Sequence, residues 1–255
     1  MQKLLAALCC IAMVGVIVLG EYYWNNNITN HAEANSITQN EEEPYDEAVT
    51  QESYDIIYTL PVELQDKAKE AIQNNETLKV VIYGSEDVAL EDGSWTDLLE
   101  NKLSEAYGDL FDVHVFSEEE KTTTDVVQEG LYEKVVDLAP DILLLEAFLL
   151  KDNGIVGVDN TIANIETIVE EVRDAQPEVT VYFLPSYPIF TATYYPRDVE
   201  AFENYAHEQN ERFLNHWEAW TEQDDALYLE EEKDRPTKVG HQVWAKYFID
   251  YFIQE

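Results

Sequence analysis

Short apolar runs alternate with longer amphipathic segments from Thr77 onward, and this alternation constrains the fold more than any other feature of the chain. Two of the runs, Leu143–Leu145 and Val179–Leu184, are apolar without alternating with polar residues, which is typical of parallel strands buried on both faces. The predicted strands are Leu78–Tyr83, Asp112–Phe116, Asp141–Glu146, Val179–Leu184 and Ala226–Leu229.

The segments between these strands have helical periodicity. Ser94 and Thr124 are favourable N-cap residues, and each is followed by an acid in the first turn. The predicted helices are Ser94–Tyr107, Thr124–Leu138, Asn160–Ala175, Asp198–Trp220 and Lys238–Ile253, after a lead-in helix that starts at Pro61 and continues to Gln73. Phe202, Phe213, Trp217 and Trp220 recur at helical spacing, which predicts a buried helix face.

Strands separated by helices imply right-handed crossovers. The sequence therefore predicts an α/β protein, a three-layer α/β/α sandwich with a five-stranded, mainly parallel sheet. In such a sheet ligands bind at the carboxyl ends of the strands, so the loops that follow the strands are where a site is expected.

The charge balance excludes several classes of partner. Asp and Glu number 53 against 15 Lys and Arg, a net charge of -38. Such a field repels nucleic acid and anionic lipid, because both bind through clustered Lys and Arg. The acids are spread along the whole chain, which favours a solvated acidic surface over a specific cation site or a basic partner.

The two cysteines, Cys9 and Cys10, both lie in the first hydrophobic segment. The predicted domain therefore contains no thiol, no disulfide and no cysteine-built metal site. His207 and His216 are nine residues apart, which is the wrong spacing for a two-histidine metal pair on one helical turn. We predict neither a cofactor nor a metal.

The N-terminus has the pattern of an export signal. Lys3 precedes an uncharged apolar run from Leu4 to Gly20. The aromatic cluster after the run, and the missing small-x-small site, favour an uncleaved anchor over a cleaved signal. We predict a signal peptide or signal anchor at residues 1–20, a flexible acidic and polar stalk at 21–58, and a folded domain at 59–255. The domain is then extracytoplasmic, and contacts a membrane only through the N-terminal segment.

Two blocks of residues carry a family resemblance. The first strand ends at Gly84-Ser85, followed by a helix that begins Trp95-Thr96-Asp97-Leu98-Leu99. Near the C-terminus the chain reads Pro236-Thr237-Lys238-Val239-Gly240-His241. This layout resembles the SGNH/GDSL hydrolases over roughly Lys79 to Tyr251. In that family the first strand runs into Gly-Asp-Ser, and the last block reads His-Pro-Asn-x-x-Gly-His.

The resemblance assigns Ser85 to the nucleophile, with Gly84 where the family has Asp. It places Arg235 at the position of the catalytic His and Glu232 at the position of the orienting acid. A guanidinium stays protonated, so it cannot accept the proton of a serine hydroxyl. His241 is the alternative base, although in the family this second His is usually a structural group.

The oxyanion donors implied by the family are also altered. Ser117 falls nearest the Gly that donates a backbone N–H, beside three consecutive glutamates. Strand register places Phe148 where the third block, Gly-x-Asn-Asp, has Asn. With a longer loop Asn153 takes that role; otherwise Asp152-Asn153-Gly154 is a turn.

The resemblance implies an extracytoplasmic SGNH/GDSL-like serine hydrolase whose substrate is an ester, an acetyl or acyl group of a cell-surface glycan or lipid. The alternative is a catalytically degenerate SGNH domain that acts as a cell-surface binding module, in which Arg235 holds a carboxylate or an anionic glycan. Aromatic residues after the fourth strand, Tyr187, Tyr194 and Tyr195, either stack on sugar rings or pack within their loop.

Overall fold

The computed structural model describes residues 56–221, 223–232 and 234–254. The predicted signal or anchor, and the predicted stalk up to residue 55, lie outside the described residues. Within the described part, no helix is both long enough and apolar enough to span a bilayer.

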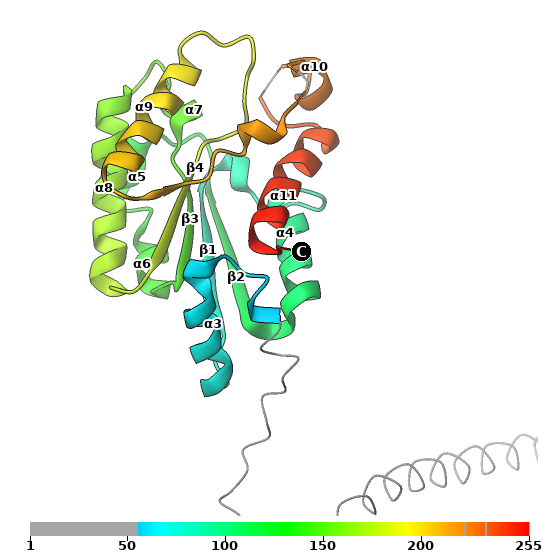
Figure 1. The fold of residues 1–255 in the computed structure, drawn as a ribbon. Coiled ribbons are helices and arrows are strands. Elements are labelled where there is room, and N and C mark those ends of the chain that lie inside the picture. The colour runs from blue at the N-terminus through cyan, green and yellow to red at the C-terminus, as the bar shows by residue number, and fades with distance from the viewer. Residues whose placement is uncertain (1–55, 222, 233, 255) are drawn as a thin grey trace, which may run out of the picture. The chain divides into compact units, whose positions relative to one another are not determined.

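The centre of the domain is a five-stranded sheet in the order β2-β1-β3-β4-β5, and every neighbouring pair is parallel (Figure 1). The order of the strands reverses between β1 and β3, the point at which such sheets bind ligands. The strands are β1 Leu78–Ser85, β2 Phe111–Glu118, β3 Ile142–Glu146, β4 Thr180–Leu184 and β5 Arg212–Phe213. The predicted α/β/α fold and four of the five predicted strands are confirmed.

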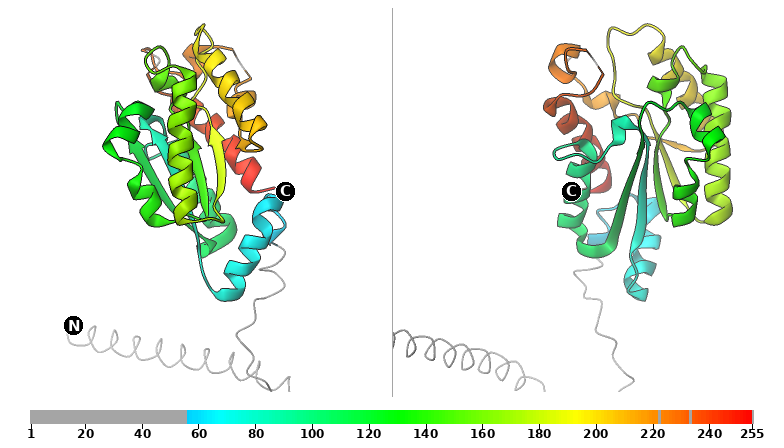
Figure 2. Two further views of the ribbon diagram at one scale, coloured as in Figure 1. Left: turned by 90° about the vertical axis from the view of Figure 1, so that its left-hand side faces the viewer. Right: turned by 180° about the vertical axis from the view of Figure 1, so that it is seen from behind.

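Successive side chains along each strand point to opposite faces of the sheet and pack into two separate hydrophobic cores. From β1, Val80 and Ile82 pack with one layer of helices, whereas Val81 and Tyr83 pack with the other. Figures 1 and 2 show the two helix layers on opposite faces of the sheet. One layer contains α3 Val62–Asn74, α4 Trp95–Tyr107 and α11 Lys238–Phe252; the other contains α5 Thr123–Glu129, α6 Glu133–Leu138, α8 Val158–Ala175 and α9 Tyr195–Glu208. Shorter elements are α7 Leu149–Asp152, α10 Asp225–Tyr228 and the 3-10 turns η1 Glu86–Val88, η2 Gly108–Leu110 and η3 His216–Ala219.

The lead-in helix is confirmed as α3. It begins after Pro61 and buries Leu64, Ala68 and Ala71 in the same core as α4 and α11. The segment just before α3 is tied to the end of the domain, because Gln254 N donates to Thr59 O at 2.8 Å.

The predicted helix Thr124–Leu138 is wrong as a single element. It is divided into α5 and α6 at Gly130, which has a φ of 67°. A residue without a Cβ adopts this left-handed conformation at no steric cost, so the chain turns there.

The predicted helix Asp198–Trp220 is wrong beyond Glu208. Asn210 adopts a left-handed conformation with φ 57°, and Glu211 N bonds back to Ala206 O at 2.8 Å, which ends the helix in a Schellman-type turn. Phe213 then belongs to β5, and Trp217 to η3. The predicted buried helix face joining these residues to Phe202 is therefore also wrong.

The predicted strand Ala226–Leu229 is wrong as well. Asp224 accepts a hydrogen bond from Ala226 N at 3.0 Å and caps the single helical turn α10. Only Leu229 is extended, and it forms an isolated antiparallel bridge with Pro236. The fifth strand is instead the two-residue β5, which is too short to show a hydrophobic pattern.

Candidate functional site

Ser85 is the last residue of β1 and is fully buried. It lies at the carboxyl edge of the sheet, where β1 and β3 end side by side. Its Oγ accepts a weak hydrogen bond from Asp87 N at 3.4 Å, so Ser85 caps the short turn η1. The carboxyl end of the first strand is where the sequence places the nucleophile, and the role of Ser85 as nucleophile stays a prediction.

Glu146, the last residue of β3, lies directly against Ser85. The backbone N–H of Ser85 donates to Glu146 Oε2 at 2.9 Å. The side chain is fully buried, and Oε1 has no hydrogen-bond partner in the described structure. A Cβ at Gly84 would lie 2.6 Å from the Glu146 Cβ, so this close approach requires glycine at position 84.

Asp87 supplies a second buried acid beside Ser85. Its carboxylate accepts a short hydrogen bond from Ser186 Oγ, in the loop after β4. Its carbonyl accepts from Trp95 Nε1 at 3.0 Å, which links η1 to the start of α4. Asp87 is 7% exposed, and Ser186 is fully buried.

The two acids have different protonation behaviour. Burial raises the pKa of Glu146 to about 8, and the negative charge of Asp87 raises it further than burial alone. Burial raises the pKa of Asp87 only to about 6, because hydrogen bonds from Ser186 and Ser85 and the charge of Lys151 oppose the effect. At neutral pH Asp87 is therefore mainly ionised and Glu146 mainly neutral.

The sequence analysis did not single out Glu146 or Asp87. In the sequence, Glu146 is a charged residue that ends an otherwise apolar strand. This pattern could have indicated a site residue, because burying a carboxylate costs free energy unless the group is paired or hydrogen-bonded. Asp87 has no such signal, since an acid two residues after a turn serine is an ordinary loop residue.

No hydrogen bond or ion pair joins Glu232 or Arg235 to Ser85 among the described residues. Both are exposed on the segment between α10 and α11, whereas Ser85 is fully buried. The Arg235 side chain is 72% exposed, and its Nε is 4.0 Å from Asp234 Oδ1. A group in this position can meet a ligand from solvent, and the roles predicted for Glu232 and Arg235 beside Ser85 stay predictions.

His241 lies in the first turn of α11 and bonds to a neighbouring helix. Its Nδ1 accepts from Trp95 N at 3.3 Å, which holds the start of α4 against α11. Burial lowers the pKa of His241, so the ring is neutral at neutral pH and suited to accept this bond. This is the structural role that the family resemblance implies for the second histidine.

The predicted oxyanion donors are separated in the structure. Ser117 lies on β2 opposite Gly84, one register position before the Ser85 pair. Asn153 Nδ2 donates to Asp198 Oδ2 at 2.6 Å and so links α7 to α9, while Gly154 follows in a left-handed turn with φ 75°. Phe148, at the family's Asn position, is buried and also left-handed, with φ 54°.

The aromatic residues after β4 have two different roles. Tyr187 and Tyr195 are each only 1% exposed and belong to the two cores. Tyr194 is 68% exposed, and the Arg197 guanidinium lies over its ring, 5.7 Å from the centroid. Loop packing therefore accounts for two of the three rings, and Tyr194 is the one of the three with a ring exposed to solvent.

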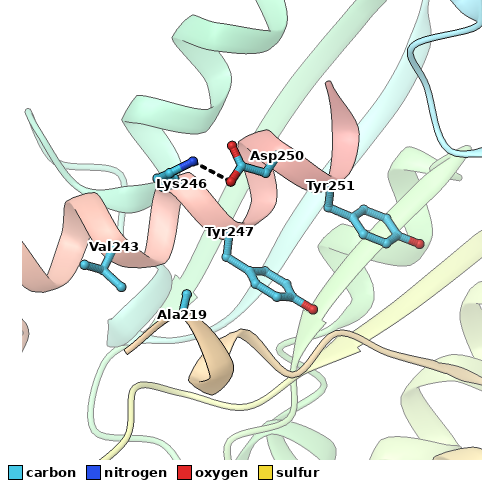
Figure 3. A pocket seen from close by; sticks show the side chains of 6 residues that line it. All are labelled: Ala219, Val243, Lys246, Tyr247, Asp250 and Tyr251. Carbon is cyan, nitrogen blue, oxygen red and sulfur yellow. Dashed lines mark hydrogen bonds and ion pairs between the residues drawn. The ribbon is translucent and has the colours of Figure 1, made fainter. Parts of the chain in front are cut away.

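A separate hollow of about 430 Å³ lies along the outer face of α11 (Figure 3). Figure 3 shows the Lys246–Asp250 ion pair beside it, at 2.5 Å. Its lining residues are Ala219, Val243, Lys246, Tyr247, Asp250 and Tyr251. None of them touches the Ser85 group, so this hollow is not part of the candidate site. Over the described ranges no cluster of three His, Cys, Asp or Glu side chains is arranged to hold a metal ion.

No protein-family model matches the sequence, and a comparison with curated proteins finds no match. Solved structures do match. A protein of the G-D-S-L family from Desulfitobacterium hafniense DCB-2, described as lipolytic, has a TM-score of 0.55 at 18% identity over 69% of this chain and 100% of its own.

Two esterases are similarly close. A catalytic mutant of an acetylxylan esterase from Geobacillus stearothermophilus has a TM-score of 0.55 at 17% identity, covering 68% of this chain and 93% of its own. A family 3 carbohydrate esterase from Clostridium thermocellum has a TM-score of 0.56 at 14% identity, covering 69% and 95%. The described domain therefore has the fold of the SGNH/GDSL hydrolases, as the sequence resemblance predicts.

Proposed function

We propose that this protein is a serine hydrolase that cleaves an ester, with Ser85 as the nucleophile. The observation that carries the proposal is the position of Ser85 at the carboxyl end of β1, beside two buried acids and at the switch point of the sheet. The fold is shared with solved proteins whose names describe esterases.

The substrate class that we propose is an acetyl or acyl ester of a cell-surface glycan or lipid. The solved neighbours support this choice, since they include an acetylxylan esterase, a carbohydrate esterase and a lipolytic protein. The exposed ring of Tyr194 suits a sugar. We also propose that the domain works outside the cytoplasm, because the apolar run Leu4–Gly20 has the pattern of an export signal.

Turnover of p-nitrophenyl acetate by the full-length chain tests the activity. We expect hydrolysis that the Ser85→Ala variant loses, because the acyl-enzyme cannot form without the hydroxyl. Ser104→Ala, on exposed surface of α4, is the matched control and should retain full turnover. A folded wild-type protein without turnover above the Ser85→Ala background would contradict the proposal.

The second candidate function is a binding module without catalysis. It is favoured by the burial of Ser85 and by the solvent-facing guanidinium of Arg235. In this case Arg235→Ala weakens retention on an immobilised anionic glycan, whereas Ser85→Ala does not. Retention that is unchanged in Arg235→Ala would exclude Arg235 as the binding group.

A further inference from the structure

A serine nucleophile needs a proton acceptor, and the predicted acceptors do not supply one. Arg235 is exposed and permanently protonated, and His241 Nδ1 is occupied by the Trp95 N–H at 3.3 Å. The titratable residues hydrogen-bonded to Ser85 are Asp87, whose backbone N–H donates to Ser85 Oγ at 3.4 Å, and Glu146, whose Oε2 accepts from the Ser85 N–H at 2.9 Å. Both come from segments that end at the same edge of the sheet.

We propose that Asp87, held in place by Ser186, accepts the proton of the Ser85 hydroxyl. The inference rests on the proposed esterase activity and adds to it the residue that replaces the family's histidine. Its geometry is a chain of contacts in which Ser186 Oγ donates to Asp87 Oδ2, and Asp87 N donates to Ser85 Oγ at 3.4 Å. The backbone contact places the Asp87 side chain beside Ser85, and the Ser85 hydroxyl is among the groups that hydrogen-bond to the Asp87 carboxylate and lower its pKa.

Asp87 is favoured over Glu146 because it ionises first. Glu146 is fully buried, and its pKa is raised to about 8 by burial and then by the charge of Asp87 itself. Asp87 receives the Ser186 hydrogen bond and the attraction of Lys151, which keep its pKa near 6. When two neighbouring acids have pKa values separated in this way, the acid with the lower pKa is ionised at neutral pH and acts as the base. The charged and titratable groups that face Asp87 are Glu86, Glu146, Lys151, Tyr187 and Tyr195.

The chemical steps balance without any further reactant than water. Ser85 Oγ bonds to the ester carbonyl carbon while its proton moves to Asp87, and the carbonyl oxygen becomes the oxyanion. The ester C–O bond then breaks, and the alcohol leaves with the proton returned by Asp87. Water attacks the acyl-Ser85 with its proton passing to Asp87, and the carboxylic acid product leaves as Ser85 regains a proton.

Glu146 sets the alkaline limit of this reaction. Its Oε2 accepts from the Ser85 N–H at 2.9 Å, so its charge lies next to the serine at which the negative charge of the transition state develops. An ionised carboxylate there repels the developing negative charge, whereas a neutral carboxyl does not. Activity therefore rises as Asp87 ionises near pH 6 and falls as Glu146 ionises near pH 8.

The test is the pH dependence of p-nitrophenyl acetate turnover for the full-length wild type and three variants. Asp87→Asn should reduce kcat about 100- to 10,000-fold, the usual contribution of a general base. Glu146→Gln should keep the rise near pH 6 and lose the fall near pH 8. Asp174→Asn, on the exposed surface of α8, is the matched control and should match the wild type.

Two outcomes overturn the inference while leaving the esterase activity in place. One is Asp87→Asn turnover equal to that of the wild type, and the other is a wild-type profile that stays flat between pH 5 and pH 7, across the value of about 6 expected for Asp87. The wild-type pH profile tests the inference even when the Asp87→Asn variant does not fold. Failure of the esterase proposal itself looks different, because the folded wild type is then inactive at every pH.

Discussion

At the scale of single residues, Gly84 and Glu146 form a complementary pair. By the resemblance to SGNH/GDSL hydrolases, position 84 would be Asp and position 146 would be Gly. In this chain glycine is at position 84, and the acidic residue, Glu146, is at the other position. The positions are adjacent, since they directly follow the paired residues Tyr83 and Leu145. A Cβ at position 84 would meet the Glu146 Cβ at 2.6 Å, so only one of the two positions carries a side chain.

This pairing predicts a coupled effect on stability. Gly84→Ala alone should lower the free energy of unfolding by about 1–3 kcal/mol, the usual cost of overpacking a core. In the Glu146→Gly background the same substitution should cost much less, because the colliding Cβ is gone. Urea unfolding of the four proteins in the double-mutant cycle measures the coupling. Equal costs of Gly84→Ala in both backgrounds would show that the two residues do not compete for the same space.

Glu146 also makes stability depend on pH. Its pKa is raised in the folded state from 4.5 to about 8, so its contribution to stability is fully present below about pH 4.5 and is lost as pH rises towards 8. The pKa of Asp87 is likewise raised on folding, from 3.8 to about 6, so its contribution to stability is lost as pH rises towards 6. We predict that Glu146→Gln is more stable than the wild type at pH 8, and that its stability falls less steeply above pH 6. Urea midpoints across this range check it; parallel curves for the two proteins would refute a buried neutral Glu146.

At the scale of elements, hydrogen bonds of the Asp152 carboxylate link three helices, α5, α7 and α8. Its carboxylate accepts from Thr123 N at 2.9 Å at the start of α5, and from Thr161 Oγ1 at 2.6 Å on α8. It also accepts a short hydrogen bond from Thr123 Oγ1. Asp152 itself ends α7 and is only 2% exposed.

Asp152→Ala should therefore destabilise the domain by about 3 kcal/mol, because it leaves buried donors of two helices without an acceptor. The matched control is Asp159→Ala, an exposed acid in the first turn of α8, which should change stability by less than about 0.5 kcal/mol. Chemical unfolding of both variants gives the comparison. Similar losses for the two would mean that the buried hydrogen bonds do not hold the helices together.

The elements that the sequence predicted correctly are those with strong local signals. Apolar runs without alternation, such as Leu143–Leu145, mark central strands, and Ser94 does cap α4 through its hydrogen bond with Asp97 N. The errors occur where tertiary structure overrides periodicity. Aromatic spacing suggested one helix through Trp220, but the left-handed Asn210 ends it, and β5 is recognisable only by its pairing with β4.

At the scale of the whole molecule, the net charge of -38 acts against the compact state. Salt screens this repulsion, with a Debye length of about 8 Å at physiological ionic strength. We predict that the thermal unfolding midpoint rises when sodium chloride is added from low salt to physiological ionic strength. Thermal scans by circular dichroism measure it. A midpoint that is unchanged or lower in salt would mean that the acidic surface carries little repulsive energy.

The site was only partly predictable because its residues come together from distant parts of the chain. Ser85 could be located from the turn at the end of the first strand. The strand order β1–β3–β4 brings Glu146 and Ser186 to it, and Asp87 follows it in η1, but nothing local in the sequence marks the three as a group. The position aligned with the family's histidine, Arg235, instead faces solvent.

The most direct test of the account is labelling of the full-length chain with a fluorophosphonate near neutral pH, followed by peptide mass spectrometry. The account predicts one covalent adduct, on the peptide that contains Ser85, with Asp87→Asn labelled far more slowly and Ser85→Ala not labelled at all. Ser104, on the exposed surface of α4, serves as an internal reference serine and should stay unmodified, because exposure alone does not activate a hydroxyl. A folded wild-type protein without an adduct on Ser85 would contradict the account, because an activated serine is its central claim.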